Sequence, residues 1–283
     1  MNPELRAEVD SALGAAVVSA SRVAGGDINE AWRAELDDGR TVFVKSRRDA
    51  PPDAFAREAE GLAWLAEADA LRVPLALATG KRSLVLPFLV SAPPSADHDE
   101  RLGRGLAALH RAGAPAFGFA RDNHLARLPQ DNRAAADWPT FYAERRLRPA
   151  LRAARDRGLL GPEDARDLDA IAAGLADRGL PEEPPSRLHG DLWSGNAMCD
   201  ERGEPVLVDP AVYGGFREMD LAMMALFGGF SERVLSAYDE AFPRAPGHEE
   251  RQPLWQLWPL LAHLLMFGPG WAPAVRRALD RVR

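Results

Sequence analysis

Three polar side chains in the C-terminal half of the chain have the types and spacing of a site for a hard cation and a proton acceptor. Asp191 precedes Asn196 by five residues, and Asp209 follows Asn196 by thirteen, at the end of an apolar run. Short strands beside this turn would bring Asn196 and Asp209 together, and their oxygens suit Mg²⁺, which also binds phosphate oxygens. Asp191 lies outside this pair, where it could accept a proton from an incoming hydroxyl.

This order resembles the catalytic loop of kinases, in which an aspartate base precedes a metal-binding asparagine by five residues and a second aspartate follows on a later loop. The loop here reads His189-Gly190-Asp191 instead of His-Arg-Asp, and Asp-Pro-Ala replaces Asp-Phe-Gly. This is the variant found in aminoglycoside and other small-molecule kinases. His-Gly-Asp alone is usually only a turn, so the prediction depends on all three polar residues being in register.

The N-terminal part of the chain offers groups that could hold ATP. Lys45 ends a predicted strand, where its ammonium could bind the α- and β-phosphates as a point charge. Glu58, in the next predicted helix, would pair with Lys45. Gly25 and Gly26 fall in the hairpin expected to cover the phosphates, although they do not form a Gly-x-Gly-x-x-Gly pattern.

Lysine is rare in this chain. Only Lys45 and Lys81 are lysines among the 35 basic residues, and the others are arginines. The two side chains are not interchangeable, since lysine carries a compact ammonium and arginine a wide planar fork. A lysine at position 45 therefore favours a role that needs the ammonium itself.

The elements that must position these residues begin with a β-rich N-terminal unit. Asp38-Gly39 between two apolar runs is a strong hairpin signal. Apolar residues at helical spacing predict helices over 4–14 and 55–68. Five strands are expected: one from Val17 toward the glycine pair, then 28–36, 41–45, 75–79 and 82–89.

The rest of the chain reads as helix-rich, after a proline-rich linker at 91–95. Residues 114–137 carry turn residues without periodicity. Short strands are predicted at 186–188 and 205–208. Helices are predicted near 102–113, over 139–157 with a kink at Pro149, over 162–179, and through most of 217–283.

These elements predict an α+β, bilobal, protein-kinase-like fold. Residues 1–90 would form a nucleotide-covering lobe, with a small antiparallel sheet and one main helix. Residues 91–283 would form a larger helix-rich lobe that carries the catalytic and acceptor-binding residues.

Composition excludes several classes of protein. The chain has 283 residues, of which 46% are hydrophobic and 27% charged, so it is long and apolar enough for a buried core. Its net charge of −7 argues against a dedicated nucleic-acid binder. Cys199 is the only cysteine, which excludes an intramolecular disulfide.

The most apolar stretch, 254–267, is shorter than the ~20 residues of a membrane span. We expect it to form a buried helix that is broken or kinked at Pro259. No targeting segment is recognised at the N-terminus. The expectation is therefore a cytoplasmic protein that binds neither membranes nor nucleic acids.

Longer motifs resemble those of the fructosamine/ketosamine-3-kinases, from about residue 13 to near the C-terminus. They are more particular than the general kinase pattern. The matching segments are 189–196 (His-Gly-Asp-Leu-Trp-Ser-Gly-Asn), 25–31 (Gly-Gly-Asp-Ile-Asn-Glu-Ala), 122–123, 129–132, 137–138, 141–147 and 215–223.

The resemblance implies phosphorylation, with ATP and Mg²⁺, of the 3-hydroxyl of ketosamines, the adducts that form when sugars glycate lysines. The phosphate then destabilises the adduct and frees the amine. The expected substrate is a glycated lysine or glycated protein, and bacterial members are expected to favour ribulosamines and erythrulosamines over fructosamines. The oligomeric state is open.

Under this reading Asp191 is the catalytic base, Asn196 and Asp209 hold the metal, and Lys45 with Glu58 holds the nucleotide. Trp193 lies between the base and the metal ligand, where its ring could face the sugar.

Two positions depart from the family pattern. Many relatives carry a cysteine where this chain has Asp27, so cysteine-based redox control at that point is not expected. Pro87 lacks an N–H group, so adenine would have to bond to neighbouring backbone groups.

Two alternatives remain open. One is a kinase for an aminoglycoside, a choline-like alcohol or another sugar. An aminoglycoside site should be densely acidic, whereas 138–157 mixes Glu144 with several arginines. The other is a pseudokinase that acts as a binding module, but such a protein usually lacks one of the polar residues found here.

Several other residues are expected to be structural. His189 would brace the loop, and Asp220 would accept hydrogen bonds from the loop backbone. His110 would be a core or helix-end histidine, and Cys199 a small core residue beside the strands of the site. Core positions are also assigned to Trp138, Trp255, Trp258 and Trp271.

Overall fold

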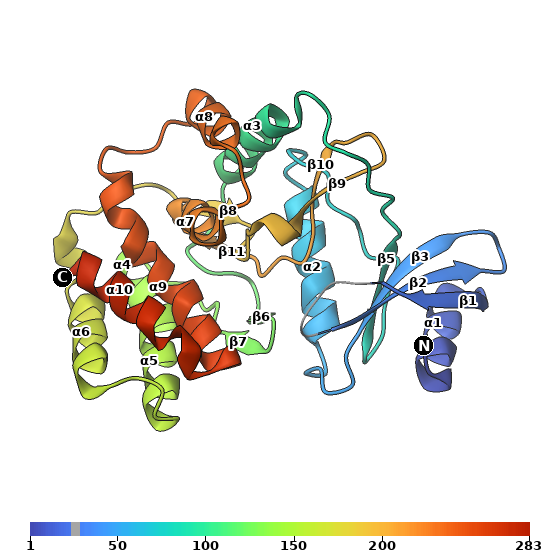
Figure 1. Ribbon diagram of the computed structural model, residues 1–283, viewed down its shortest axis with the longest axis horizontal. Coiled ribbons are helices and arrows are strands. Elements are labelled where there is room, and N and C mark those ends of the chain that lie inside the picture. Colours follow the sequence, from blue (N-terminus) through green and yellow to red (C-terminus); the bar gives the residue numbers. More distant parts are fainter. Residues whose placement is uncertain (24–28) are drawn as a thin grey trace.

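Two lobes make up the protein in the computed structural model, which describes residues 1–23 and 29–283 (Figure 1). One lobe is built on an antiparallel sheet with the strand order β1-β2-β3-β5-β4, and this confirms the five predicted strands. Its strands are β1 (Val17–Arg22), β2 (Glu30–Leu36), β3 (Thr41–Ser46), β4 (Ala78–Thr79) and β5 (Ser83–Pro87).

The two faces of this sheet are covered by different helices. Side chains alternate along a strand, so Val42 and Val44 of β3 point to one face, where they pack with Leu5 and Val9 of α1 (Pro3–Leu13). The odd-numbered residues of β3 point to the other face, toward α2 (Ala54–Ala66). The strand period therefore directs Lys45 to α2.

The second lobe contains most of the helices, as predicted. The helical run near 139–157 passes through a π-helical turn at Ala143–Leu147, just before Pro149. The helices are α3 (His98–Arg111), α4 (Trp138–Tyr142), α5 (Arg148–Asp156), α6 (Pro162–Ala173), α7 (Glu218–Phe227), α8 (Glu232–Ala241), α9 (His248–Phe267) and α10 (Ala272–Val282). A lobe boundary between residues 90 and 91 stays a prediction.

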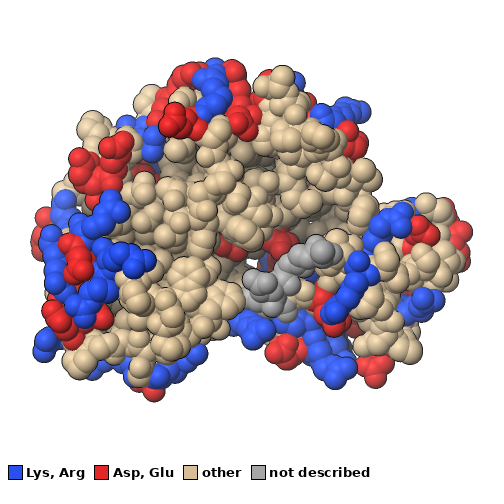
Figure 2. Space-filling view, in the orientation of Figure 1, with Lys and Arg blue, Asp and Glu red and all other residues tan. Residues whose placement is uncertain are grey.

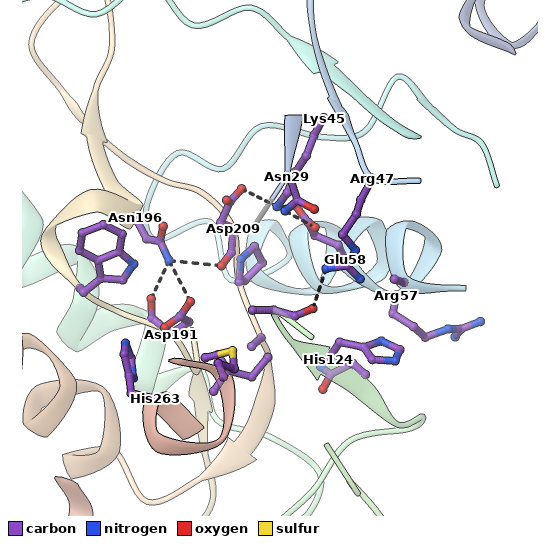
Figure 3. Close-up of a pocket in the computed structure, with 18 of the residues that line it drawn as sticks. Asn29, Lys45, Arg47, Arg57, Glu58, His124, Asp191, Asn196, Asp209 and His263 are labelled. Atoms are coloured by element: carbon purple, nitrogen blue, oxygen red, sulfur yellow. Dashed lines mark hydrogen bonds and ion pairs between the residues drawn. The ribbon is translucent and has the colours of Figure 1, made fainter. Parts of the chain in front are cut away.

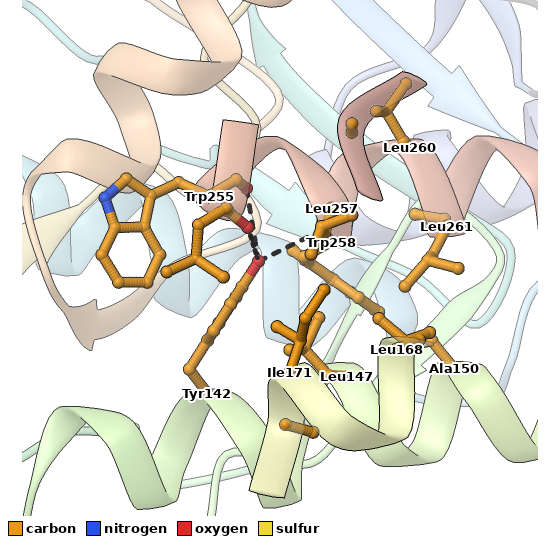
Figure 4. Close-up of a cluster of buried hydrophobic side chains, with 14 of the residues drawn as sticks. Tyr142, Leu147, Ala150, Leu168, Ile171, Trp255, Leu257, Trp258, Leu260 and Leu261 are labelled. Atoms are coloured by element: carbon orange, nitrogen blue, oxygen red, sulfur yellow. Dashed lines mark hydrogen bonds between the residues drawn. The ribbon is translucent and has the colours of Figure 1, made fainter. Parts of the chain in front are cut away.

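A break or a kink was expected at Pro259, and helix α9 runs through that residue without a break. The hydroxyl of Tyr142 lies beside the α9 backbone (Figure 4). It donates a hydrogen bond to the carbonyl of Leu254 (2.7 Å), lies 3.4 Å from that of Trp255, and accepts one from the N–H of Trp258 (3.3 Å). Pro259 has no N–H group to donate to the carbonyl of Trp255. Next to this interruption, the buried hydroxyl of Tyr142 bonds both the carbonyl of Leu254 and the N–H of Trp258.

The two short strands predicted near the site, at 186–188 and 205–208, are present as β8 (Ser186–Leu188) and β10 (Pro205–Leu207). Each pairs with a strand that the sequence did not predict. β8 pairs with β11 (Tyr213–Gly215), and β10 pairs with β9 (Ala197–Cys199).

A further hairpin lies in the segment expected to be irregular. It consists of β6 (Asn123–Leu125) and β7 (Leu128–Gln130). None of the unpredicted strands exceeds three residues, which is too short for a periodic sequence signal.

No helix in the described parts of the chain has both the length and the hydropathy needed to cross a bilayer. The apolar stretch 254–267 instead forms most of α9, whose buried side chains join the main hydrophobic cluster of the second lobe.

Candidate active site

A cavity of about 450 Å³ lies between the two lobes, where Figure 2 shows the surface to be hollowed, with acidic side chains visible in the hollow. Among the described residues that line it are Lys45 of β3, Glu58 of α2, Asp191, Asn196 and Asp209. Figure 3 shows the side chains of these five residues directed toward one another. Gly25 and Gly26, expected to cover phosphates, lie outside the described residues.

Lys45 forms the centre of a buried ion-pair group. Its Nζ lies 2.9 and 3.0 Å from the carboxylate oxygens of Glu58 and 3.1 Å from Oδ1 of Asp209. Burial alone would lower the pKa of Lys45, but the carboxylates of Asp209 and Glu58 raise it above its usual value. The lysine therefore remains a cation, and Glu58 fixes its direction.

The loop that carries Asp191 is held in place through hydrogen bonds that its backbone makes. Asp220 accepts hydrogen bonds from the N–H groups of His189 (2.7 Å) and Gly190 (2.9 Å). His189 donates from Nε2 to the carbonyl of Val208 (2.9 Å), which leaves its Nδ1 to accept from the N–H of Asp191 (3.3 Å). These contacts agree with the bracing roles expected for His189 and Asp220.

His110 holds Asp220 in place in turn, since its Nε2 lies 3.2 Å from the carboxylate of Asp220. Burial opposes the charge of Asp220, but hydrogen bonds from His110 and the loop hold its pKa below the usual value. The carboxylate is therefore ionised and can anchor the loop at neutral pH.

Asp191 and Asn196 form the part of the site nearest the second lobe. The side-chain nitrogen of Asn196 lies 2.8 Å from the backbone oxygen of Asp191 and 3.3 Å from its Oδ2. Burial, followed by the nearby charge of Asp209, raises the pKa of Asp191 to about 7. A carboxylate with a raised pKa can accept a proton from a hydroxyl near neutral pH.

Asp209 adopts a left-handed backbone conformation, with φ of 54°. Such a conformation is uncommon outside glycine and often marks a functional site. The residue before it is fixed on both sides, because the N–H of Val208 donates to Asn196 (3.0 Å) and its carbonyl accepts from His189. The side chain of Asp209 stays 43% exposed and faces the cavity.

The donor set suits a hard cation. Asn196 uses its nitrogen within the loop, so its carbonyl oxygen and the carboxylate of Asp209 are available as ligands. Within the described ranges no group of three His, Cys, Asp or Glu side chains forms a metal site. A cation here would therefore need further oxygens from water or a bound phosphate.

The side of the cavity next to Asp191 is aromatic. Trp193 is 41% exposed, and its ring centroid lies 6.5 Å from that of Phe227. The ring of His263 packs between Phe227 (4.9 Å) and Trp271 (4.6 Å). Trp271 was expected in the core, but it is only half-buried: it packs against the main hydrophobic cluster of the second lobe and also lines the cavity.

His263 has a defined tautomer. Its Nδ1 lies 2.7 Å from the carbonyl of Pro259, so this nitrogen carries the proton and donates. Burial lowers the pKa of His263, which keeps the ring neutral and leaves Nε2 as an acceptor. Figure 3 shows His263 on the same side of the cavity as Asp191.

Of the side chains in this aromatic wall of the cavity, sequence reasoning predicted Trp193 and missed the others. It also missed Arg47 and Arg57, which lie across the cavity from His263 in Figure 3. The only available signal was the i, i+4 spacing of His263 and Phe267 on α9, which is equally typical of core. The lining residues missed include Arg47, Arg57, Asn123, His124, Phe227, His263, Met266, Phe267 and Trp271.

Comparison with known proteins identifies the family. The family model described as fructosamine kinase matches residues 1–283. A Thermus thermophilus protein named probable ketoamine kinase is 41% identical over 90% of this chain and 91% of its own length. The chloroplastic protein-ribulosamine 3-kinase of Arabidopsis thaliana is 36% identical over 91% of this chain and 80% of its own.

Solved structures agree. A crystal structure assigned as a fructosamine-3-kinase from Thermobifida fusca superimposes with a TM-score of 0.91 at 38% identity, and covers all of this chain and 99% of its own. A gentamicin complex of an aminoglycoside phosphotransferase, at 13% identity and a TM-score of 0.66, shares only the fold. These likenesses confirm the protein-kinase-like fold class. With a family model matched over its whole length, the chain belongs to the fructosamine kinase family.

Proposed function

We propose that this protein transfers the γ-phosphoryl group of ATP to the 3-hydroxyl of a ketosamine, the first step of a deglycation repair reaction. The observation that carries the proposal is the convergence of Lys45, Glu58, Asp191, Asn196 and Asp209 on one cavity in a member of the fructosamine kinase family. A cytoplasmic location, where ATP is available, belongs to the same proposal.

Each side chain has a role that follows from its position. When bound, ATP with Mg²⁺ supplies the phosphoryl group and neutralises part of its charge. Lys45, directed by Glu58, binds phosphate oxygens, and Asn196 and Asp209 hold the metal. Asp191 would orient the acceptor hydroxyl and take its proton onto a carboxylate oxygen as the hydroxyl oxygen bonds to the γ-phosphorus. The bond from that phosphorus to the β–γ bridging oxygen breaks in the same transfer, and ADP leaves. Positioning and charge neutralisation thus provide most of the catalysis.

The aromatic wall supports a sugar as acceptor. Trp193 offers a flat apolar surface for the C–H groups of a polyol, and the Nε2 of His263 can accept a hydrogen bond from a second hydroxyl or from the adduct amine. Since Trp193 is partly exposed, the lysine end of the adduct can extend into solvent. This arrangement suits either a glycated lysine or a glycated protein.

An aminoglycoside is a less suitable acceptor. The carboxylates that line the described part of the cavity are Glu58, Asp191 and Asp209. Each has a role in the proposed transfer, and the wall beside Asp191 adds none. A polycation would therefore meet aromatic rings where acidic groups are needed.

The proposal is tested with purified protein, ATP, Mg²⁺ and a panel of acceptors: ribulosamine-lysine, erythrulosamine-lysine, fructosamine-lysine, kanamycin and choline. We expect mass spectrometry to detect phosphate addition to a ketosamine, and ribulosamine-lysine to exceed kanamycin and choline in kcat/KM. Phosphorylation of kanamycin with none of any ketosamine would instead support the aminoglycoside alternative.

Trp193→Ala tests the acceptor side of the cavity. We expect kcat/KM for ribulosamine-lysine to fall and the KM for ATP to stay nearly unchanged, because the ring faces the acceptor and not the nucleotide. Steady-state kinetics with each substrate varied in turn measure both quantities. Unchanged ketosamine kinetics would return Trp193 to a structural role.

A further inference from the structure

A group of buried amide side chains, one of which lines the cavity, has no role in the proposed mechanism. Asn123 and Gln130 belong to the β6–β7 hairpin, and Asn132 follows it. Their exposures are 5%, 1% and 0%, and Arg146, also 0% exposed, adjoins them. We call these four residues the amide cluster. Buried polar side chains are unfavourable unless they are bonded, so their partners indicate what they do.

The hydrogen bonds of the amide cluster run in one direction. Arg146 donates from Nη2 to Oδ1 of Asn132 (2.7 Å), and Asn132 donates from Nδ2 to Oδ1 of Asn123 (2.9 Å). Asn123 donates from Nδ2 to the backbone carbonyl of Val212 (2.8 Å). Because a charged donor starts the chain, each bond polarises the next. The side-chain amides of Asn132 and Asn123 are thereby each held in one orientation.

This series of hydrogen bonds ends at the segment that carries Asp209. Gln130 reaches the same segment, since its Nε2 lies 3.3 Å from the carbonyl of Ala211 and 3.0 Å from Oδ1 of Asn123. The two carbonyls held by amide side chains therefore lie two and three residues beyond Asp209. On the other side of Asp209, Val208 is held by Asn196 and His189, as described above.

Arg146 ties the cluster to the same segment a second time. Its guanidinium lies 4.2 Å from the ring centroid of Tyr213, the residue after Val212, and 4.7 Å from that of Phe141. Among the described residues no carboxylate lies within ion-pair distance of Arg146. The cation is balanced instead by aromatic faces and by oxygens of Asp131 and Asn132. Its energetic partners are thus the rings and amides that hold residues 211–213.

We propose that the amide cluster is a positioning device that sets the place of Asp209 by holding the two carbonyls that follow it. Asp209 needs such support because its backbone has the strained φ noted above and its side chain must reach both Lys45 and the metal. Asn123 acts through Asp209 and touches no reacting atom. The expected effect on kinetics rests on the proposed phosphoryl transfer. The expected effect on the backbone around Asp209 does not depend on it.

The structural consequence is tested by hydrogen–deuterium exchange of the nucleotide-free protein. Asn123→Ala is compared with Tyr142→Phe, which also loses a buried hydrogen-bond donor, but one that bonds the backbone of α9 and not residues 208–213. Both variants should be less stable than wild type. Only Asn123→Ala should speed exchange in the peptide that spans 208–216. Equal exchange of that peptide in the two variants would overturn the proposal.

The catalytic consequence is tested by kinetics of the same variants. Misplacement of a reacting group by about 1 Å can cost on the order of 10²-fold in rate. We expect Asn123→Ala to lower kcat at least about tenfold and to raise the KM for ATP, with the KM for the acceptor little changed. Tyr142→Phe should stay within about twofold of wild type in each parameter. Wild-type kinetics in a folded Asn123→Ala would also overturn the proposal.

A third variant decides the outcome if Asn123→Ala does not fold. Asn132→Ala interrupts the series of hydrogen bonds one step earlier, between Arg146 and Asn123. It is judged by the same exchange and kinetic criteria. If the wild-type protein phosphorylates no ketosamine, the proposed function fails, while the exchange comparison still decides whether the cluster holds the Asp209 segment.

Discussion

Asp191 is placed where the folded protein disfavours its negative charge. Burial and the neighbouring charge of Asp209 raise its pKa to about 7, whereas an aspartate in an unfolded chain titrates near ~4. A base with such a pKa is suited to a hydroxyl acceptor at neutral pH. The same environment means that the ionised carboxylate destabilises the nucleotide-free fold.

The sign of this effect gives a first prediction. Because the folded pKa exceeds the unfolded value, ionised Asp191 opposes folding above pH 7, and the penalty disappears as pH falls toward ~4. Asp191→Asn should therefore raise the Tm of the nucleotide-free protein at pH 8 by about 2–4 °C, or ~1 kcal/mol for a protein of this size. Near pH 4 the two proteins should unfold at similar temperatures. A lower Tm for Asp191→Asn at pH 8 would contradict the assigned environment.

Lys45 gives the second prediction at this scale. It is 7% exposed and is enclosed by Glu58 and Asp209, so the wider fork of arginine cannot take its place without displacing one of them. Lys45→Arg should lose most activity and raise the KM for ATP while it stays folded by circular dichroism. Lys81→Arg, at the only other lysine and an exposed one, is the matched control. Full activity of Lys45→Arg would show that charge alone is needed.

At the scale of elements, the start of the 189–196 loop, just after β8, depends on a glycine. Gly190 has φ of 82°, and an added Cβ would lie 2.0 Å from the carbonyl oxygen of Ala211. Glycine thus permits both the left-handed conformation and the close approach of the two segments that carry Asp191 and Asp209.

Gly190→Ala is therefore expected to separate those segments and lower both stability and activity. Gly179→Ala is the control, because Gly179 also has a positive φ (61°) but has no atom within 4 Å of an added Cβ. The control should lose only the ~1–2 kcal/mol of left-handed strain and keep its activity. Thermal unfolding and steady-state kinetics of both variants check this. Equal effects of the two substitutions would refute the role given to the contact with Ala211.

Elements were predictable from sequence where they are long or carry local signals. The five strands and the main helices have clear periodicity, and Asp38-Gly39 marked the turn after β2. The pairing of β8 with β11 was not predictable, since three-residue strands gain their partners from tertiary packing. The continuity of α9 was not predictable for a related reason: the hydroxyl of Tyr142, distant in sequence, bonds the backbone near Pro259.

For the whole molecule, the site joins chain segments whose sequence signals differ in strength. Asp191, Asn196 and Asp209 could be placed together because they flank short strands within one local motif. Lys45 and Glu58 come from the other lobe and could be assigned only by their order and their resemblance to kinases. The part of the aromatic wall that comes from α7, α9 and Trp271 escaped prediction, because apolar residues at helical spacing read the same whether they face a core or a cavity.

The most direct test of the central claim is the position of the transferred phosphate. Wild-type protein and Asp191→Asn are each incubated with ATP, Mg²⁺ and ribulosamine-lysine, and the products are followed by ³¹P and ¹³C NMR. The account predicts one phosphate ester on the 3-hydroxyl with wild type, and turnover lower by at least ~10² with Asp191→Asn, whose binding of ATP is retained. Phosphate at another oxygen, no ester at all, or turnover by Asp191→Asn within a few-fold of wild type would contradict it.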